Sequence, residues 1–275
     1  DKKKPKEDLV VFFRPNRPQK RLLANLWHRN VILKARQLGF TTLVCILWLD
    51  TALFNENMRC GIIAQDRDAA EVIFRDKVKF AYINLPESLR NQMPLARDSA
   101  SELLFGHNNS SIRVATSMRS GTIHRLHISE FGKICAKYPD KAKEVVTGSI
   151  PAVPQTGILI IESTAEGREG EFHSITMRAK AAKDSNKELT VRDYRFHFFA
   201  WWDEERYCMP VDSVKLTDKD LAYFERIEAQ IGQTISPEKR AWYIATRDAD
   251  FSGSEEKMWQ EYPSTPEEAF QQSTE

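Results

Sequence analysis

Short apolar runs alternate along the chain with segments in which apolar positions recur at helical spacing. The runs with the length and composition of buried strands are residues 31–33, 59–65, 125–130 and 157–164. Helical spacing follows three of them, at residues 41–49, 66–82 and 171–183. Because strands alternate with helices in this order, the pattern predicts an α/β fold, a mostly parallel sheet flanked by helices.

The rest of the pattern before residue 203 adds smaller elements. A helix is expected to begin at Pro18 and to run through Trp27, because proline fits a first helical turn. Two strands across a Gly-His-Asn-Asn turn, at 102–106 and 111–116, are expected to form a hairpin at the sheet edge. Residues 85–100, with their two prolines, are expected to be a loop. Helical structure is also expected at residues 141–146, and an aromatic-rich strand at 192–202.

From residue 203 the strand pattern is lost. Amphipathic helices are expected at 216–231 and 237–247, and a third helical or looped piece at 259–270. The chain is therefore predicted to have a core of residues 1–202 and a small, mostly helical lid or linker subdomain of residues 203–275. Trp201 and Trp202, at the boundary, are interpreted as packing residues rather than as a platform for stacked bases.

The first apolar run leads through a polar loop into a helix, an arrangement in which backbone N–H groups and a helix N-terminus hold phosphate. Against the motif G-x-x-x-x-G-K-[ST], Gly39 matches the second glycine and Thr41 the hydroxyl that holds Mg²⁺. Phe40 stands at the lysine position and Lys34 at the first glycine. Since such a loop wraps its anion, a lysine at its front can reach the same phosphate oxygens. The alternative is an ordinary strand–helix turn that carries lysine and glycine.

This loop defines a set of expected contacts to ATP. Arg36 is a second cation within the loop. Gln19 lies in the first turn of the preceding helix, where its amide can both donate to and accept from the adenine edge. The expected nucleotide-binding residues are Gln19, Lys34, Ala35, Arg36, Gln37, Leu38, Gly39, Phe40, Thr41 and Thr42.

Two further strand ends carry polar groups that would meet the loop, because ligands of parallel sheets bind outside the carboxyl ends of the strands. Ser129 and Glu130 stand where an Asp-Glu pair usually orders the Mg²⁺ shell and polarises the attacking water. Ser129 keeps the hydrogen-bonding capacity without the charge, and Thr164 ends the next strand at a height suited to sensing a γ-phosphate. The expected Mg²⁺ residues are Thr41, Ser129 and Glu130. The alternative for Glu130 is a solvated strand end.

Composition narrows the class of protein. Hydrophobic residues make up 41% and charged residues 29% of the 275 positions, enough for a real core and a well-solvated surface. A net charge of +1 gives no global attraction to nucleic acid, so any such contact must be a local patch. The four cysteines show no C-x-x-C spacing, which argues against a zinc site and favours reduced thiols. No apolar run reaches membrane-spanning length, and no membrane partner is expected.

In this combination the segments resemble the large terminase subunit of tailed bacteriophages. The matching segments are residues 34–42, 126–131, 161–167 and 262–270. The most specific are the first, an Arg-Gln-Leu-Gly loop with the lysine at its front, and the last, Tyr-Pro-Ser-Thr-Pro-Glu-Glu-Ala-Phe. The resemblance covers the chain from about Arg14 to its last residue. It implies a RecA-like P-loop NTPase domain followed by a lid. The family's C-terminal nuclease domain is expected to be absent from this chain, and nuclease activity is not expected.

The resemblance implies an ATP hydrolase that drives double-stranded DNA into a procapsid, with ATP and Mg²⁺ as ligands. It implies the portal protein and the small terminase subunit as partners and a homo-oligomeric ring in the assembled motor. A monomer is expected in isolation, because the net charge is near zero and no long coiled-coil pattern offers an assembly surface. The expected location is the cytoplasm of the infected bacterial host. The alternatives are a superfamily 2 helicase-like translocase and a nucleotide-binding scaffold without hydrolysis, which Phe40 and Ser129 would suit.

The resemblance also suggests catalytic roles. Lys34 would hold phosphates, Glu130 would position water, and Thr164 would couple the γ-phosphate to movement. Arg119 is expected to complete a neighbouring subunit's active site, and Arg36 is the rival that would act within its own subunit. The open alternative for Arg119 is a surface arginine that contacts no phosphate.

Overall fold

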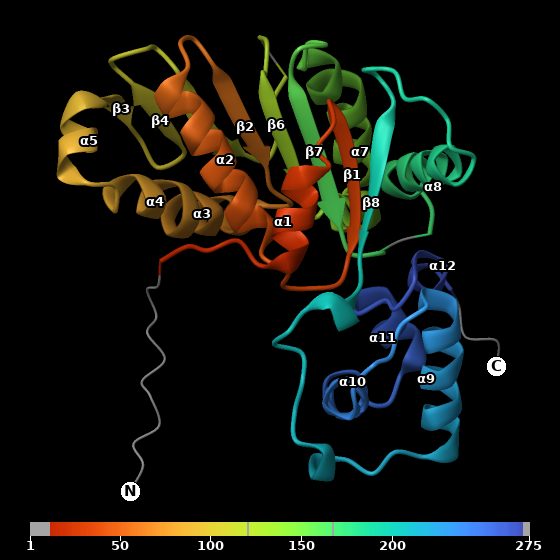
Figure 1. Ribbon diagram of the computed structural model, residues 1–275. Coiled ribbons are helices and arrows are strands. Elements are labelled where there is room, and N and C mark those ends of the chain that lie inside the picture. Colours follow the sequence, from red (N-terminus) through yellow and green to blue (C-terminus); the bar gives the residue numbers. More distant parts are fainter. Residues whose placement is uncertain (1–11, 120, 167, 272–275) are drawn as a thin grey trace, which may run out of the picture.

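The computed structural model describes residues 12–119, 121–166 and 168–271. An eight-stranded sheet with the order β3-β4-β5-β2-β6-β7-β1-β8 forms its centre (Figure 1). Neighbours from β5 through β2, β6, β7 and β1 to β8 run parallel, whereas β3, β4 and β5 pair antiparallel. The expected fold class and the expected edge hairpin, β4 with β5, are confirmed. The strands are β1 (Arg29–Lys34), β2 (Arg59–Ile63), β3 (Leu95–Asp98), β4 (Glu102–Phe105), β5 (Ser111–Ala115), β6 (Arg125–Ser129), β7 (Ile158–Ser163) and β8 (Tyr194–Phe199).

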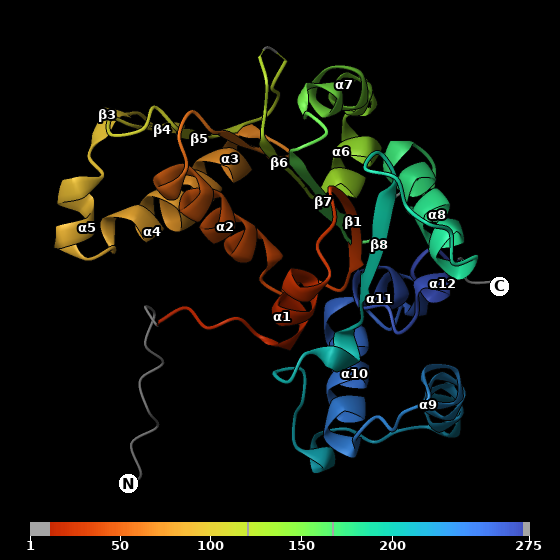
Figure 2. The ribbon, with the colours of Figure 1, turned by 45° about the horizontal axis from the view of Figure 1, so that its top comes forward.

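Helices cover both faces of the sheet, as Figure 2 shows, and a helical segment follows β8. On one face lie α1 (Arg17–Ala24), α2 (Phe40–Phe54), α3 (Arg67–Ile73), the π-helical turn Phe74–Lys79 and α4 (Phe80–Ile83), with α5 (Glu87–Gln92) at the edge. On the other lie α6 (Phe131–Lys137), α7 (Pro139–Glu144), the π-helical turn Val145–Ser149, the 3₁₀ turn Ile150–Ala152 and α8 (Glu171–Asp184). After β8 come the 3₁₀ turns Trp201–Asp203 and Val211–Ser213, then α9 (Asp218–Ile231), α10 (Pro237–Asp250), α11 (Glu255–Glu261) and α12 (Pro266–Ala269). No helix in the described ranges is long and apolar enough to cross a membrane.

The central strands are apolar on both faces because both faces are covered. Val31 and Leu33 of β1 belong to the hydrophobic cluster under α6 and α8, while Ile32 belongs to the cluster under α2. The same alternation in β7 sends Leu159 and Ile161 to the first cluster and Ile160 to the second. A strand buried on both faces reads as a continuous apolar run, which is the signal in the sequence.

The expected loop at residues 85–100 is wrong, because it contains α5 and β3. Its two prolines stand at element boundaries rather than inside a loop. Pro86 immediately precedes α5, and Pro94 immediately precedes β3. β3 then pairs antiparallel with β4 and extends the sheet edge. A proline can therefore stand directly before a helix or a strand as readily as within a loop.

Trp201 and Trp202 anchor the C-terminal helical segment to the end of β8. The indole of Trp201 donates to Ser264 Oγ at 2.8 Å and that of Trp202 to the Ser264 carbonyl at 2.9 Å. Trp201 is fully buried and lies 4.7 Å, between ring centroids, from Tyr243 of α10. The expectation that this pair packs is confirmed.

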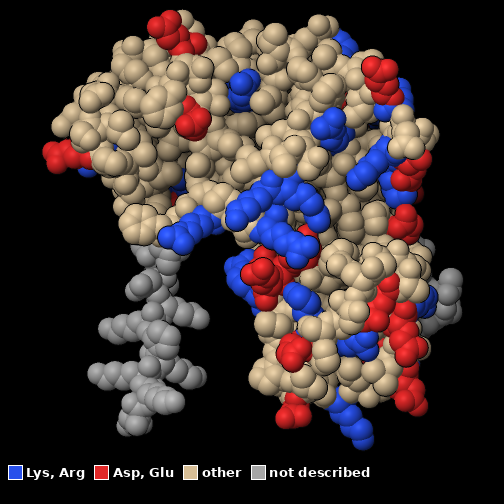
Figure 3. Space-filling model, viewed as in Figure 1, with Lys and Arg blue, Asp and Glu red and all other residues tan. Residues whose placement is uncertain are grey.

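Basic side chains gather over α1, beside a group of acidic ones at the start of the C-terminal helical segment (Figure 3). Arg14, Arg17, Lys20 and Arg21 are exposed. The buried carboxylate of Asp203 pairs with Arg17 Nε at 3.3 Å and with Arg21 at 2.9 Å. This contact ties α1, which precedes the phosphate loop, to the turn that follows β8.

The close approach of α6 to the end of β7 requires glycine at position 132. A Cβ built there would lie 2.7 Å from Ser163 Oγ, 2.9 Å from the Glu166 carbonyl and 3.0 Å from the Thr164 carbonyl. We expect Gly132→Ala to lower the free energy of unfolding by about 1–3 kcal/mol, as overpacking does. Gly148→Ala is the matched control, because its nearest neighbour would be Arg119 Cγ at 3.9 Å. Urea denaturation of both variants tests this; equal stability of Gly132→Ala and wild type would contradict it.

Glu268 gives the junction between β8 and the helical segment a dependence on pH. Its carboxylate accepts from Tyr223 Oη at 2.7 Å and from the Ser264 amide at 3.0 Å. Burial raises the pKa of Glu268 from 4.5 to about 7 against the opposing effect of these hydrogen bonds. The folded state therefore holds this proton more tightly than the unfolded state does.

Stability should consequently fall as pH rises from about 4.5 through about 7, because the buried carboxyl then has to ionise. We expect the unfolding free energy of Glu268→Gln to decrease less than that of wild type over this pH range, because glutamine has no proton to lose. Glu267→Gln, at the exposed neighbouring carboxylate, should keep it. Urea denaturation across this pH range measures the difference. Parallel pH profiles for wild type and Glu268→Gln would show the assignment to be wrong.

Candidate nucleotide-binding site

Three neighbouring strands bring polar side chains to one corner of the sheet. Because β6, β7 and β1 are adjacent and parallel, their carboxyl ends share an edge. In register, Ser129 lies beside Glu162, and Glu162 beside Ile32. Side chains alternate along a strand, so Lys34 follows Ile32 on the face covered by α2, where Glu162 and Ser129 also lie. The structure brings the expected residues Lys34, Ser129 and Glu130 to one corner, and the sheet order adds Glu162.

Lys34 is the centre of this cluster. Its buried ammonium lies 3.2 Å from Glu130 Oε1 and 3.4 Å from Glu162 Oε2. Burial opposes the charge, but the two carboxylates outweigh it and raise the pKa of Lys34 above its usual value of 10.5. A cation is thus held at the front of the loop, at the end of β1.

Glu162 is the residue that sequence reasoning missed. It is fully buried on β7, accepts from Ser129 Oγ at 2.9 Å and lies 3.2 Å from His127 Nε2. Burial raises the pKa of Glu162, but Lys34, His127 and Ser129 together lower it from 4.5 to about 2, so the carboxylate is ionised. The available signal was a glutamate inside the most apolar strand of the chain, since a buried carboxylate needs partners.

Glu130 has an unusual backbone. Its φ of 53° and ψ of 47° place it in the left-handed region, directly before α6. Such a conformation is costly for a residue with a side chain and clusters at functional sites. The conformation sends its carboxylate between Lys34 and Lys133, the latter 3.6 Å from Oε2. Glu130 is therefore partly exposed but fixed from both sides, unlike a free strand end.

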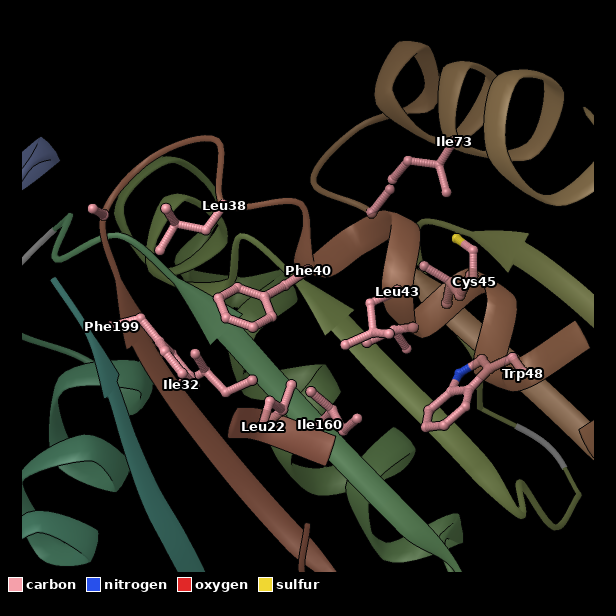
Figure 4. Packing of buried hydrophobic residues seen from close by; sticks show 14 of the residues in the cluster. Leu22, Ile32, Leu38, Phe40, Leu43, Cys45, Trp48, Ile73, Ile160 and Phe199 are labelled. Carbon is pink, nitrogen blue, oxygen red and sulfur yellow. The ribbon is translucent and has the colours of Figure 1, made fainter. Parts of the chain in front are cut away.

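In the segment from the end of β1 to the start of α2, the lysine stands at the first position, Lys34, and a core residue, Phe40, stands at the usual lysine position. Gly39 adopts φ 79° before α2, and a Cβ there would lie 2.7 Å from Gln19 Nε2. Phe40, at the usual lysine position, points into the core and lies 4.6 Å from Phe199 between ring centroids (Figure 4). Its side chain is therefore a packing element, and any contact to a ligand is left to its backbone N–H.

Gln19 braces the loop from α1. Its Nε2 donates to the Gly39 carbonyl at 2.7 Å, and its Oε1 accepts from the Asn16 amide at 2.8 Å. Asn16 Nδ2 in turn donates to the Leu38 carbonyl at 3.1 Å. Both ends of the Gln19 amide are thus engaged within the protein. Each end keeps one further hydrogen-bonding capacity, and a contact to adenine stays a prediction.

The C-terminal helical segment holds the other side of the loop. The Arg36 amide donates to the Glu261 carbonyl at 3.0 Å, and the Arg36 carbonyl accepts from Tyr207 Oη at 2.6 Å. Arg206 donates to the Gln37 carbonyl at 3.0 Å. The side chain of Arg36 lies 3.4 Å from Glu261 Oε2, so its charge is directed toward the helical segment rather than toward Lys34.

Of the remaining expected site residues, the three threonines lie at the start of α2 and after β7, and Arg119 lies before β6. Thr41 and Thr42 lie in the first turn of α2, where Thr42 Oγ1 accepts from Lys77 Nζ at 2.8 Å. Thr164 is buried directly after β7. Arg119 is exposed, and its side chain pairs with Glu144 of α7 rather than with a residue of the Lys34 cluster.

The donor set at the strand ends fits a magnesium ion of the kind that P-loop domains bind with nucleotide. Within the described residues, buried oxygens without a hydrogen-bond partner include Glu130 Oε2 and Glu162 Oε2 at this corner, and Thr164 Oγ1 directly after β7. Mg²⁺ prefers oxygen donors and is usually held by one or two carboxylates together with phosphate and water. Carboxylates and hydroxyls are what this corner offers.

The fold and the loop at the end of β1 define a RecA-like P-loop class of α/β domain. More particularly, the fold is that of large terminase ATPase domains. The chain aligns with the large terminase ATPase domain of Thermus phage P74-26 at a TM-score of 0.57 and 16% identity, over 92% of this chain and 94% of that one. It aligns with the large terminase of bacteriophage HK97 at a TM-score of 0.53 and 16% identity, over 86% of this chain and 46% of that one. No protein-family model and no curated protein sequence matches the chain.

We expect Lys34, and not the side chain at position 40, to contact bound phosphate. Lys34→Met should weaken binding of ATP by about 1.5–3 kcal/mol, the contribution of a hydrogen bond to a charged group. Phe40→Leu, which keeps an apolar side chain in the core, should bind as wild type does. Fluorescence titration with a labelled nucleotide measures both. Equal affinities for Lys34→Met and wild type would reject the displaced lysine.

Proposed function

We propose that this chain is the ATPase motor domain of a viral DNA-packaging terminase, which hydrolyses ATP to move double-stranded DNA into a procapsid. The observation that carries the proposal is the buried lysine at the front of the loop after β1, between carboxylates from β6 and β7. Such a loop and helix N-terminus bind phosphate, and parallel sheets bind ligands at this edge. The shared fold with large terminase ATPase domains supports the motor among the functions that this site could serve.

In the proposed mechanism, Lys34 exchanges one carboxylate partner for phosphate oxygens of ATP. The backbone of residues 35–42 would surround the phosphates, and Gln19 would read the adenine edge. Arg36 is the loop cation of the same subunit, and it must leave Glu261 to reach phosphate. The site is therefore built so that binding replaces internal ion pairs by contacts to ligand.

The residues proposed to hold Mg²⁺ are Thr41, Ser129 and Glu130. Bound with the nucleotide, Mg²⁺ supplies neutralisation of the charge that develops on the transferred phosphoryl group. Glu130 has a second proposed role as the group that positions and polarises water, because its carboxylate is partly exposed at the mouth of the cluster. Thr164, adjacent on β7, is proposed to sense the γ-phosphate through its unpartnered hydroxyl.

The assembly is part of the same proposal. Residues 1–202 would form the ATPase core and residues 203–275 the lid, in a chain that is monomeric alone and forms a ring in the motor. Portal protein and small terminase subunit are the proposed partners, in the cytoplasm of the infected bacterial host. The exposed basic side chains over α1 supply the local patch that contact with DNA requires in a chain of net charge +1. Arg119 is proposed to serve a neighbouring subunit, since its own-chain partner is Glu144.

A nucleotide-binding scaffold without hydrolysis is the second candidate, favoured by the missing carboxylate at Ser129. Glu130→Gln separates the two, because glutamine keeps the size of the side chain but cannot act as a base. We expect this variant to bind ATP and to hydrolyse it about 10²–10⁴-fold more slowly than wild type, the usual share of a general base.

The measurement is steady-state release of phosphate with a parallel nucleotide titration. Glu169→Gln, at an exposed glutamate in the loop after β7, is the control and should retain full turnover. If wild type and Glu169→Gln hydrolyse ATP and Glu130→Gln does not, the result supports the ATPase. ATP binding by wild type without hydrolysis, also in the presence of DNA and procapsid, would favour the scaffold.

A further inference from the structure

The carboxylate missing from β6 is present on the neighbouring strand. Position 129, where nucleotide sites of this class usually carry the aspartate that orders the Mg²⁺ shell, holds serine. Glu162 is the register partner of Ser129 across the parallel pair β6 and β7. The hydroxyl of Ser129 donates to Glu162 Oε1 at 2.9 Å. A negative charge therefore lies one strand away from its usual backbone position, and the residue at the usual position orients it.

Glu162 is a costly residue to bury at this position. Its side chain is fully buried in a strand whose preceding residues, from Ile158 to Ile161, are isoleucine and leucine. One oxygen contacts Ser129 and His127, while Oε2 pairs with Lys34 at 3.4 Å. Removing a carboxylate from water is costly, and a buried ion pair often stabilises a fold no better than apolar residues of similar volume in both of its positions.

The same oxygen points toward the place where the phosphate loop holds its cation. Oε2 lies 3.4 Å from Lys34 Nζ, and Glu130 Oε1 lies 3.2 Å from the same nitrogen. Two carboxylates thus share one buried ammonium at the front of the loop. When Lys34 exchanges a carboxylate for phosphate, the positive charge that it shares between the two carboxylates is reduced, and Glu162, which is buried while Lys34 faces it, then needs another cation.

We propose that Glu162 replaces the missing aspartate: it supplies the negative charge that orders the water shell of nucleotide-bound Mg²⁺, with Ser129 as the residue that orients it. Glu162 is in this sense a positioning residue behind the residues proposed to hold Mg²⁺, and Glu130 keeps its second proposed role on water. The inference rests on the proposed function, since it assigns a role within the same nucleotide site. It also removes the argument that Ser129 makes this site unable to use a metal.

The rival role for Glu162 is that of a counter-ion that only places Lys34. The two roles differ in how nucleotide affinity responds to metal. A counter-ion for Lys34 affects the binding of ATP with and without Mg²⁺ alike. A residue that orders the Mg²⁺ shell affects only the tightening of binding that Mg²⁺ produces.

The experiment is a fluorescence titration of the whole chain with a labelled, non-hydrolysable ATP analogue, in excess EDTA and in saturating Mg²⁺. For wild type we expect Mg²⁺ to tighten binding. For Glu162→Gln we expect the tightening to fall by about 10–100-fold or to vanish, the usual effect of losing an outer-shell partner of a metal. Affinity in EDTA should stay equal or increase, because a negative charge beside the phosphates is gone. Glu169→Gln is the control and should match wild type in both conditions.

Returning the charge to β6 gives the sharper test. The double variant Ser129→Asp with Glu162→Gln carries the carboxylate at the usual strand end and should regain the tightening by Mg²⁺. Circular dichroism melting without ligand reports whether each variant folds. Should Glu162→Gln alone fail to fold, the double variant still decides, because it keeps a second carboxylate near Lys34.

Three results overturn the inference. One is full tightening by Mg²⁺ in Glu162→Gln, and another is an equal loss of affinity in EDTA and in Mg²⁺, which identifies a counter-ion. The third is a folded double variant that shows no tightening. Absence of nucleotide binding by wild type in both conditions would instead refute the proposed function, and the inference with it. The arms of the titration therefore distinguish the two failures.

Discussion

A buried ammonium shared by two carboxylates is the interaction on which the arrangement of this molecule depends. Lys34, Glu130 and Glu162 come from three strand ends, and a charge in the interior is tolerable only where its partners are fixed. The order β6-β7-β1 is the feature of the sheet that brings those ends together. The left-handed backbone at Glu130 and the glycine at 132 then let α6 begin close to β7. Strain at one residue and the absence of a side chain at another are the local conditions for the ion cluster.

The exchange between positions 34 and 40 follows from the same geometry. A lysine at the usual position would lie at the start of α2, where Phe40 instead fills the space between that helix and Phe199 of β8. The cation has to come from elsewhere, and the last residue of β1 is on the α2 face because Ile32, two residues earlier, is on that face. One position thus provides packing and the other provides charge. In the proposed phosphate site, the two roles are assigned in reverse order along the chain.

The parts of the fold that could be predicted from the sequence are those set by local pattern. The central strands read as apolar runs because each is covered on two faces, and the displaced lysine could be inferred from the spacing within one short loop. Glu162 could not be inferred in the same way. Its partner Ser129 is far away in the chain, and only the register of β6 against β7 sets them side by side. The helix and strand within residues 85–100 were missed because proline signals a boundary without saying what begins there. The internal contacts of Gln19 and Arg36 likewise depend on tertiary structure.

The phosphate loop is held from two sides, and this limits what it can do independently. Gln19 and Asn16 bind its carbonyls from α1, while Tyr207, Arg206 and Glu261 bind it from the C-terminal helical segment, as the distances above show. The Arg36 amide is already donated to the Glu261 carbonyl, and the side chains of the same two residues form an ion pair. An amide has one proton to donate, so a phosphate that takes the Arg36 amide must displace Glu261. A phosphate that also recruits the Arg36 side chain removes the second contact between the loop and α11. A phosphate bound by the Arg36 amide and the hydrogen bond from that amide to the Glu261 carbonyl are then mutually exclusive, which is a physical condition for a bound ligand to alter how the two parts of the chain are joined.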